Sequence, residues 1–275
     1  MALQRNEKIN RLGRLLPEGL AVDAAWLETQ GYSRALRSQY VSSGWLASPV
    51  RGVYWRPRGR LRWEQVVISL QVLLQYPVSV GGRTALELGG YGHYGYREQK
   101  VVHLYTDRKL PSWLGKLEGM PDFVIHNRGR LFSDVSDYAD MLSLEGEGKP
   151  RLPDGLEVDP WGQWDWPLVR SGPERAILEL LDELPGGASF DMADKIMEGL
   201  VNLRPRRMQS LLEDCGSIKV KRLFFFFASR HKPQWLGAIE RSKIDLGSGK
   251  RVIARGGRLD KTWQITVPED MDAIR

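Results

Sequence analysis

The first 60 residues carry three short helical patterns followed by a hairpin pattern, and this order constrains the fold more than any other feature of the sequence. Apolar residues recur at helical spacing over residues 3–16, and Pro17 and Gly19 end that segment. A second helix is expected over Leu20–Thr29 and a third over Arg34–Ser43. Three short helices therefore precede the hairpin.

The hairpin consists of two extended pieces, Trp45–Ala47 and Gly52–Arg56, joined by the turn Ser48-Pro49-Val50-Arg51. Three helices and a hairpin in so short a span predict a winged helix-turn-helix. The expected fold class is α+β. Residues 1–60 would form the winged helix-turn-helix DNA-binding domain, and residues 61–275 a larger mixed α/β domain.

The middle of the chain alternates between helical and extended patterns. Helices are expected over residues 63–76 and Arg83–Leu88, and strands over Val101–Thr106 and Pro121–Asn127. Residues 144–172 are rich in Gly, Pro and Trp, which indicates either a long ordered loop or a seam between subdomains.

The last hundred residues open with three helical patterns, over residues 173–184, Phe190–Leu200 and Pro205–Asp214. Two extended pieces are expected after them. The first, Ile218–Phe227, ends in four phenylalanines and reads as a strand buried on both faces, and the second is Trp263–Val267. The order helix, helix, helix, strand leaves open a second winged-helix-like unit that serves packing rather than DNA binding.

Charge is distributed unevenly along the chain. Residues 1–62 carry a net charge of +7, residues 63–199 carry −9 and residues 200–275 carry +8. A basic module attracts polyanions because phosphates release their condensed counterions when it binds. The first module therefore favours nucleic acid, although a basic surface that binds nothing, or a protein-interaction module, stays open.

In a helix-turn-helix the second helix of the motif lies in the major groove. If Leu36 faces inward, Tyr40 lies only 40° away around the helix and shares the buried face. The residues expected to contact DNA from this helix are Ser33, Arg34, Arg37, Ser38 and Ser42. The residues expected to contact phosphate or the minor groove from the wing are Arg51, Arg56 and Arg58.

A second group of basic residues lies near the end of the sequence. Its members are Lys243, Lys250, Arg251, Arg255 and Arg258. They either extend a nucleic-acid surface or form an ordinary solvated face, and the sequence does not favour one reading over the other.

These patterns match a known family. The run GLAVDAAWLETQGYSRALRSQYVSSGWLASPVRGVYWRPRG resembles the N-terminal winged-helix domain of AbiEi-type antitoxins of type IV toxin–antitoxin systems. The similarity rests on Gly31 before the reading helix, Gly44-Trp45-Leu46 after it and Arg51-Gly52-Val53-Tyr54 on the wing. It continues through the segments GRTALEL, LYT, PERAILELLDEL and LLEDCGSIKVKRLFFFFA.

The resemblance implies a bacterial repressor of its own operon, which binds inverted repeats in its promoter through the N-terminal domain. It implies that the larger domain counteracts a toxin of nucleotidyltransferase fold without forming a stable complex with it. It implies no enzymatic activity, no catalytic residue and no cofactor.

Two other functions stay open. The first is a metal-dependent nuclease, because Pro121-Asp122 followed by Glu147-Gly148-Lys149, with Glu87 upstream, resembles the spacing of a PD-(D/E)xK site. Glu147 lies among glycines and near a proline, however, which is typical of a loop rather than of the buried strand that such a site needs. The second is a ligand-responsive regulator without a toxin partner.

The histidines and the cysteine do not predict a metal site. The histidines His93, His103, His126 and His231 show no metal-ligand spacing with one another or with a cysteine. His103 and His126 fall in strand patterns and read as core or sheet-face residues, and His93 lies in a Gly/Tyr-rich loop. The lone Cys215 reads as a small buried residue.

Trp161, Trp164 and Trp166 form a closely spaced aromatic group that either pins a loop to the core, which is the commoner role, or binds a partner. No secretory signal is expected from the first residues, and the longest apolar runs are too short for a membrane span. The expected location is therefore a reducing cytoplasm, with no membrane partner.

Overall fold

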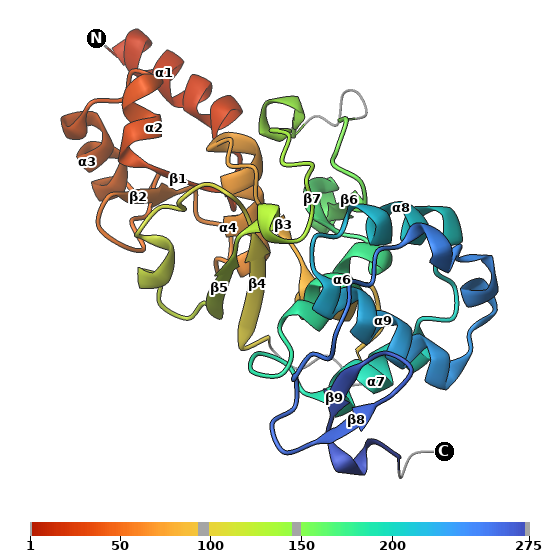
Figure 1. The fold of residues 1–275 in the computed structure, drawn as a ribbon. Helices are drawn as coiled ribbons and strands as arrows, with labels where there is room; N and C mark the ends of the chain where they lie inside the picture. Colours follow the sequence, from red (N-terminus) through yellow and green to blue (C-terminus); the bar gives the residue numbers. More distant parts are fainter. Residues whose placement is uncertain (1, 93–98, 145–149, 273–275) are drawn as a thin grey trace.

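The computed structural model describes residues 2–92, 99–144 and 150–272. It confirms the α+β class. Figure 1 shows an N-terminal module of helices α1–α3 at one end, a mixed sheet in the middle, and helices α6–α9 with a small hairpin at the other end. None of the helices described is long and apolar enough to cross a membrane.

The described α-helices are α1 (Ala2–Leu15), α2 (Ala24–Thr29), α3 (Arg34–Ser42), α4 (Trp63–Ile68), α5 (Gly82–Leu88), α6 (Pro173–Asp182), α7 (Phe190–Gly199), α8 (Pro205–Asp214) and α9 (Ile218–His231). The described strands are β1 (Ala21–Asp23), β2 (Val53–Trp55), β3 (Ser79–Val80), β4 (Val101–Tyr105), β5 (Asp122–His126), β6 (Leu156–Trp161), β7 (Trp166–Ser171), β8 (Arg258–Asp260) and β9 (Ile265–Val267).

The central sheet has the strand order β5-β4-β3-β7-β6. β3 runs antiparallel to β4 and parallel to β7, β4 is parallel to β5, and β6 is antiparallel to β7. The β6–β7 ladder extends from Leu156 opposite Ser171 to Trp161 opposite Trp166. The expectation of a long loop or seam over residues 144–172 is therefore wrong for β6 and β7, which are part of the sheet.

One face of the sheet is covered by α4, which continues as a π-helical turn over Ser69–Leu73. Gln71 in this turn is fully buried, and its side-chain amide donates hydrogen bonds to the carbonyls of Val78 (2.8 Å) and Val169 (2.9 Å). Its side-chain oxygen accepts from the Val169 amide at 3.0 Å. The buried amide is thus satisfied and fastens the helix to β7 and to the residue that precedes β3.

The other face of the sheet is covered by α5 and α6 (Figure 1). The buried carboxylate of Glu179 on α6 accepts from Arg175 (2.9 Å), from Ser171 (3.0 Å) and from the backbone amide of Gly82 (2.8 Å). Its burial raises the pKa of Glu179. A Cβ at Gly81 would overlap this carboxylate, which explains the glycine before α5.

α8 is fastened to α6 and β6 by ion pairs. The Arg204 guanidinium binds Glu174 at 2.8 Å and Glu157 at 2.5 Å, and Arg207 binds Glu157 at 2.6 Å. Burial disfavours the charged carboxylates, but the arginine hydrogen bonds outweigh it and lower the pKa of Glu174 and Glu157. These two arginines therefore have a structural role, because they connect α8 to α6 and β6.

The segment predicted as the strand Ile218–Phe227 is instead the start of helix α9, so that prediction is wrong. Ser217 caps the helix by accepting from the Val220 amide at 3.4 Å. The four phenylalanines are at most 4% exposed, because the helix is surrounded by α6, α7 and the β8–β9 hairpin. A helix buried on all sides reads as a continuous apolar run, like a buried strand. The expected order helix, helix, helix, strand is therefore not observed.

Among the residues that the structure describes, the apolar core forms two clusters. The first joins α6–α9 with part of α5 and the β8–β9 hairpin. The second runs from Leu12 in α1 through α4 to Val169 in β7, so it crosses the predicted domain boundary at residue 60. The Ala21 amide also donates to the Ser69 hydroxyl across that boundary at 2.9 Å. The division at residue 60 stays a prediction.

Two arginine–tryptophan contacts brace the same junction. Arg58 lies over the ring of Trp164 at 4.2 Å, and Arg62 lies over Trp161 at 5.2 Å. Both arginines lie in the segment between β2 and α4, whereas Trp161 is the last residue of β6 and Trp164 lies in the turn to β7. The third tryptophan, Trp166, is 5% exposed and stacks on Trp164. Trp166 therefore holds this hairpin to the body of the protein, while Trp164 is 44% exposed, so the partner-binding alternative stays open.

Candidate nucleic-acid interface

The N-terminal module has the strands that a winged helix requires. β1 pairs with β2 in antiparallel register, and Ala47 pairs with Trp55 through a bridge whose two hydrogen bonds measure 2.9 and 3.0 Å. The bridge confirms the predicted hairpin. The helix predicted from Leu20 is corrected, because β1 takes its first residues and α2 begins only after Asp23, whose side chain caps it by accepting from the Trp26 amide.

Helix α3 begins at Arg34, as predicted, and ends at Ser42, one residue before the predicted end. Ser33 is its N-cap, with the hydroxyl oxygen accepting from the Leu36 amide at 3.4 Å. Tyr40 is 1% exposed and lies 6.2 Å from the ring of Tyr32, whose hydroxyl donates to the Lys8 carbonyl in α1 at 2.9 Å. These contacts fix the inner face of α3 against α1 and α2.

The outer face of α3 is polar and exposed. Arg34, Ser38 and Ser42 are all exposed, as the helical spacing predicted. A shallow hollow of about 640 Å³ runs along the helix. It is lined by Lys8, Ser33, Ala35, Leu36, Ser38, Gln39 and Ser42. Small polar side chains and a lysine therefore form a solvent-open surface beside α3.

Arg37 does not belong to that surface. It is 3% exposed and donates to the carbonyls of Ala24 (3.1 Å) and Tyr32 (3.0 Å) and to the carboxylate of Glu28 (2.7 Å). The flank position expected for it is covered by α2. Its guanidinium holds α2, the turn and α3 together, so Arg37 is not on the exposed face from which contacts to DNA were expected.

The arginines of the wing differ from one another. Arg51 is exposed at the turn of the hairpin. Arg56 is half-buried and donates to the carbonyls of Gly13 and Leu16, both at 3.0 Å, and to Glu18 at 3.1 Å. Arg56 therefore joins β2 to the end of α1, and it too leaves the set expected to contact phosphate. Arg58 keeps an exposed guanidinium, 3.5 Å from Glu18.

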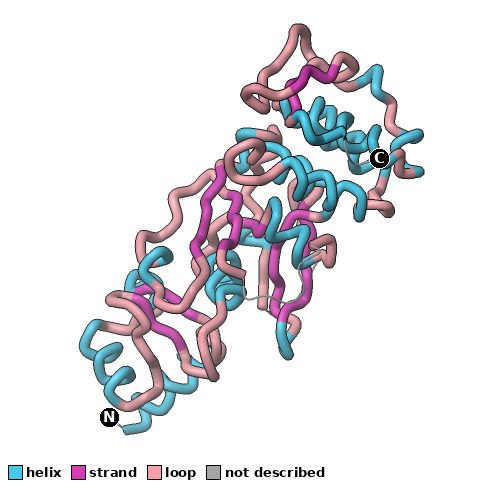
Figure 2. Tube along the Cα trace, turned by 90° about the horizontal axis from the view of Figure 1, so that it is seen from below, coloured by secondary structure: helices cyan, strands magenta, loops and turns pink. Residues whose placement is uncertain are grey.

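The second basic group lies at the opposite end of the molecule from α3, on and before the β8–β9 hairpin (Figures 1 and 2). Lys250, Arg251 and Arg255 are exposed there, and Arg258 is half-buried on β8. Lys243 is exposed and forms an ion pair with Glu240 at 2.9 Å. These residues do not continue the surface of α3.

The residues of the nuclease hypothesis are only partly described. Asp122 is exposed at the start of β5. Glu87 on α5 accepts hydrogen bonds from Arg83 at 2.6 Å and Gln99 at 3.4 Å. Glu147 and Lys149 lie outside the described residues, as does His93. That hypothesis stays a prediction.

The structure brings together two histidines that sequence spacing did not connect. His103 on β4 and His126 on β5 face each other with Nδ1 and Nε2 3.0 Å apart, and Glu183 lies 3.2 Å from His103. Burial lowers the pKa of His126, and it raises the pKa of the nearby Tyr105 phenol. The only sequence signal was a histidine in each of two strand patterns, and their pairing depends on the parallel register of β4 and β5.

The remaining residues singled out from the sequence are structural. Cys215 is 1% exposed at the end of α8, as expected, and burial raises the pKa of its thiol. His231 at the end of α9 binds Asp194 of α7 at 2.9 Å. It connects two helices of the C-terminal core.

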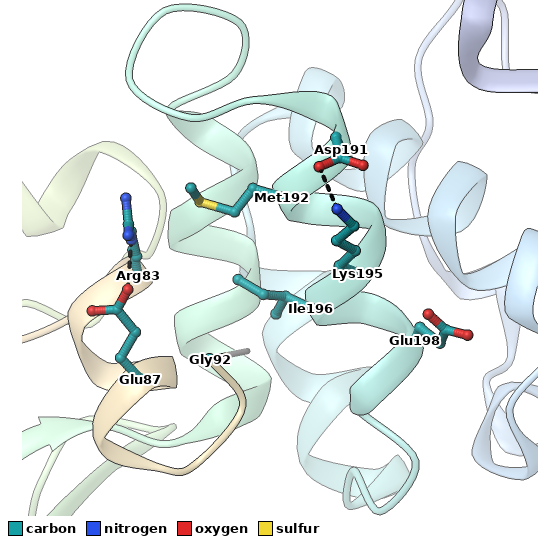
Figure 3. A pocket seen from close by; sticks show the side chains of 8 residues that line it. All are labelled: Arg83, Glu87, Gly92, Asp191, Met192, Lys195, Ile196 and Glu198. Carbon is teal, nitrogen blue, oxygen red and sulfur yellow. Dashed lines mark hydrogen bonds and ion pairs between the residues drawn. The ribbon is translucent and has the colours of Figure 1, made fainter. Parts of the chain in front are cut away.

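A pocket of about 330 Å³ lies between α5 and α7 (Figure 3). It is lined by Arg83, Glu87, Gly92, Asp191, Met192, Lys195, Ile196 and Glu198. Two of its charged pairs lie within single helices, Arg83 with Glu87 at 2.6 Å and Lys195 with Asp191 at 2.8 Å. Such intrahelical pairs are common on helix surfaces and do not indicate a ligand.

The fold and the exposed face of α3 define a class of proteins in which a small winged-helix module is joined to a larger body built around a mixed sheet. Residues 5–95 match the family described as the N-terminal domain of the AbiEi antitoxin transcriptional regulator. Residues 99–268 match the family described as transcriptional regulator, AbiEi antitoxin, type IV toxin–antitoxin system. The chain belongs to the AbiEi antitoxin family of type IV toxin–antitoxin systems.

One solved structure with a similar fold is that of the RV2827C protein from Mycobacterium tuberculosis. The TM-score is 0.53 at 14% sequence identity, and the alignment covers 94% of this chain and 88% of that chain. At this identity the similarity concerns the fold alone. No curated protein matches the sequence.

Proposed function

We propose that this chain represses its own operon by binding inverted repeats in its promoter through the N-terminal module. The observation that carries the proposal is the polar, exposed face of α3, where Arg34, Ser38 and Ser42 point to solvent while Tyr40 and Arg37 hold the helix in place. A helix presented in this way fits the major groove, with arginine reading guanine and serine contacting bases or phosphates.

The start of α3 and the wing would supply the contacts to the DNA backbone. Ser33 lies at the N-terminus of α3, where the helix dipole favours a phosphate. Arg51 and Arg58 are exposed on the wing side, and Lys8 lies across the hollow on α1. Such contacts position a protein on the duplex and carry no sequence information.

The test is a titration of the promoter region and of random DNA of equal length with matched variants. Arg34→Ala should weaken promoter binding and reduce the difference in affinity between promoter and random DNA. Arg51→Ala, at the exposed turn of the wing, should weaken binding to both DNAs alike and lower the salt slope by about one unit. Equal loss of specificity from both variants would show that α3 does not read the sequence.

We further propose that the chain counteracts a nucleotidyltransferase-fold toxin without a stable complex, in the cytoplasm and without catalysis of its own. Family membership supports this part. The two proposed activities, promoter binding and counteraction of the toxin, can be separated by variants. Because the apolar core crosses residue 60, point variants of α3 test this separation more cleanly than a truncation. Arg34→Ala should lose promoter specificity and still rescue growth of cells that express the toxin.

The two alternative functions, a nuclease and a ligand-responsive regulator, predict different experimental results. Magnesium-dependent cleavage of DNA that disappears in Asp122→Ala would support the nuclease. A small molecule that changes promoter binding, in a chain that rescues no toxin, would support a ligand-responsive regulator. Loss of rescue in a folded Arg34→Ala protein would contradict the separation of the two activities.

A further inference from the structure

The strongest cluster of unassigned chemistry lies on the sheet face that carries α6. In the parallel register of β4 and β5, Tyr105 is opposite His126, and His103 lies two residues before Tyr105 on the same face. Glu183 follows directly after α6 and lies over these side chains. Three elements distant in sequence thus place two imidazoles and a carboxylate at one point.

The distances within the cluster match those of a metal site. His103 Nδ1 lies 3.0 Å from His126 Nε2 and 3.2 Å from Glu183 Oε1, and His126 Nε2 lies 3.9 Å from Glu183 Oε1. Tetrahedral zinc with bonds of about 2.0–2.1 Å separates its ligand atoms by about 3.3 Å. A circle through the three atoms has a radius of about 2.0 Å, close to one zinc–ligand bond.

The surroundings suit a bound cation. The His103 and Glu183 side chains are 9% and 7% exposed, so water competes little for them. The His126 side chain is 23% exposed and leaves a path to solvent. The Tyr105 hydroxyl donates to Glu183 Oε1 at 3.4 Å, and its ring stacks on His126 at 4.6 Å. Such outer contacts orient metal ligands.

We propose that His103, His126 and Glu183 form a binding site for one divalent transition-metal ion of the Zn²⁺ class. Two imidazoles and one carboxylate are a ligand set that zinc accepts, with a fourth position left for water. The ion fastens the end of α6 to β4 and β5, and so joins the helical half of the protein to its sheet. Among the described residues, no other group of three such side chains has its donor atoms this close together.

The test uses the full-length, untagged chain, treated with a chelator, dialysed and titrated with Zn²⁺. We expect about one zinc per chain and a higher melting temperature with zinc than without, because a ligand that binds only the folded state stabilises it. Co²⁺ should give the visible absorption of a tetrahedral site with nitrogen and oxygen ligands. A wild-type chain that retains no zinc would overturn the proposal.

His126→Ala should lower zinc affinity by more than about 100-fold, because loss of an outer contact alone costs about 10–100-fold. His126 lies on an edge strand and is partly exposed, so this variant should fold. Glu183→Gln keeps the shape of the side chain and should also weaken zinc binding. It serves as a second variant should the first lose structure by circular dichroism.

The matched control is His231→Ala. His231 also binds a carboxylate, that of Asp194 at 2.9 Å, but within the described part of the chain that pair belongs to no group of three potential ligands. This variant should bind zinc like the wild type. Unchanged affinity in His126→Ala, or equal loss in the His231 variant, would overturn the proposal.

Discussion

The two basic regions of this protein carry almost the same charge and use it differently. Residues 1–62 carry +7 and residues 200–275 carry +8. In the first region, Arg34 and Arg51 are exposed around α3 and the wing. In the second, the buried Arg222 is held by three backbone carbonyls, and the guanidinium of Arg204, whose side chain is 48% exposed, is held by two glutamates. Net charge therefore does not reveal which region faces a polyanion.

The same contrast exists within the N-terminal module. Arg34 and Arg37 are three residues apart on one helix, yet one is exposed and the other is 3% exposed. Arg37 supports α3, and Arg34 extends from it. Variants of these and other residues separate arginines that support the fold from the arginine proposed to read DNA, and their expected effects are given from the largest to the smallest.

Arg37→Ala should have the largest effect, a loss of about 3 kcal/mol in the free energy of unfolding, because the buried carbonyls of Ala24 and Tyr32 lose their charged donor. Urea denaturation followed by circular dichroism measures it. Arg37→Lys is the matched control and should recover only part of the loss, since one ammonium cannot reproduce the fork of a guanidinium. Wild-type stability in the alanine variant would contradict a supporting role.

Arg34→Ala should cost about 1–3 kcal/mol in promoter binding and leave unfolding unchanged. The physical reason is the loss of a bidentate contact to a base edge by an exposed side chain. A binding titration beside the same denaturation experiment checks both parts. A loss of stability like that of Arg37→Ala would remove the distinction between the two arginines.

Acid should weaken the ion pairs that hold α8 to α6 and β6. Glu157 and Glu174 have lowered pKa values in the fold, so their contribution to stability is present above the unfolded pKa, near 4.5, and is lost as the pH falls below it. Between pH 6 and 3.5, the wild type should lose about 2–4 °C more in melting temperature than Glu157→Gln. Equal losses would show that Glu157 contributes nothing through its charge.

Arg255→Ala should have the smallest effect, below about 0.5 kcal/mol on promoter binding, because the β8–β9 hairpin lies at the far end of the molecule from α3. The promoter titration at two salt concentrations measures it. A loss as large as that of Arg34→Ala would place DNA along the whole length of the protein.

The sequence predicted those parts of the fold in which local signals agree. The Ser33 cap, Gly44 after α3 and the turn from Ser48 define a helix and a hairpin by themselves, and both are observed. β1 was missed because three residues are too few for a periodic pattern, and its pairing with β2 depends on residues 30 positions away. The register between two distant strands cannot be predicted from the sequence of either strand alone.

α9 and β6–β7 were missed for opposite reasons. The phenylalanines of α9 favour a strand locally, and their tertiary burial on all sides overrides this propensity. The prolines of the β6–β7 hairpin argue against strands. Pro160 and Pro167 are opposite each other near the turn, however, whereas β3 pairs with β7 only at Arg170, so neither proline interrupts the pairing with β3. The burial of Arg37 and the contact between His103 and His126 were missed for a related reason. Both depend on which distant residues pack beside these side chains, and the local sequence does not show this.

The stacking of Arg58 on Trp164 and of Arg62 on Trp161 has a consequence for binding entropy. A DNA-reading module on a loose tether gives up its orientational freedom at the moment it docks, and that loss subtracts from affinity. Here the N-terminal module that carries α3 is already packed against the body of the protein when the chain folds. In the proposed DNA binding, the orientational entropy of the module is therefore lost during folding rather than on docking, and more of the contact energy remains to discriminate between DNA sequences.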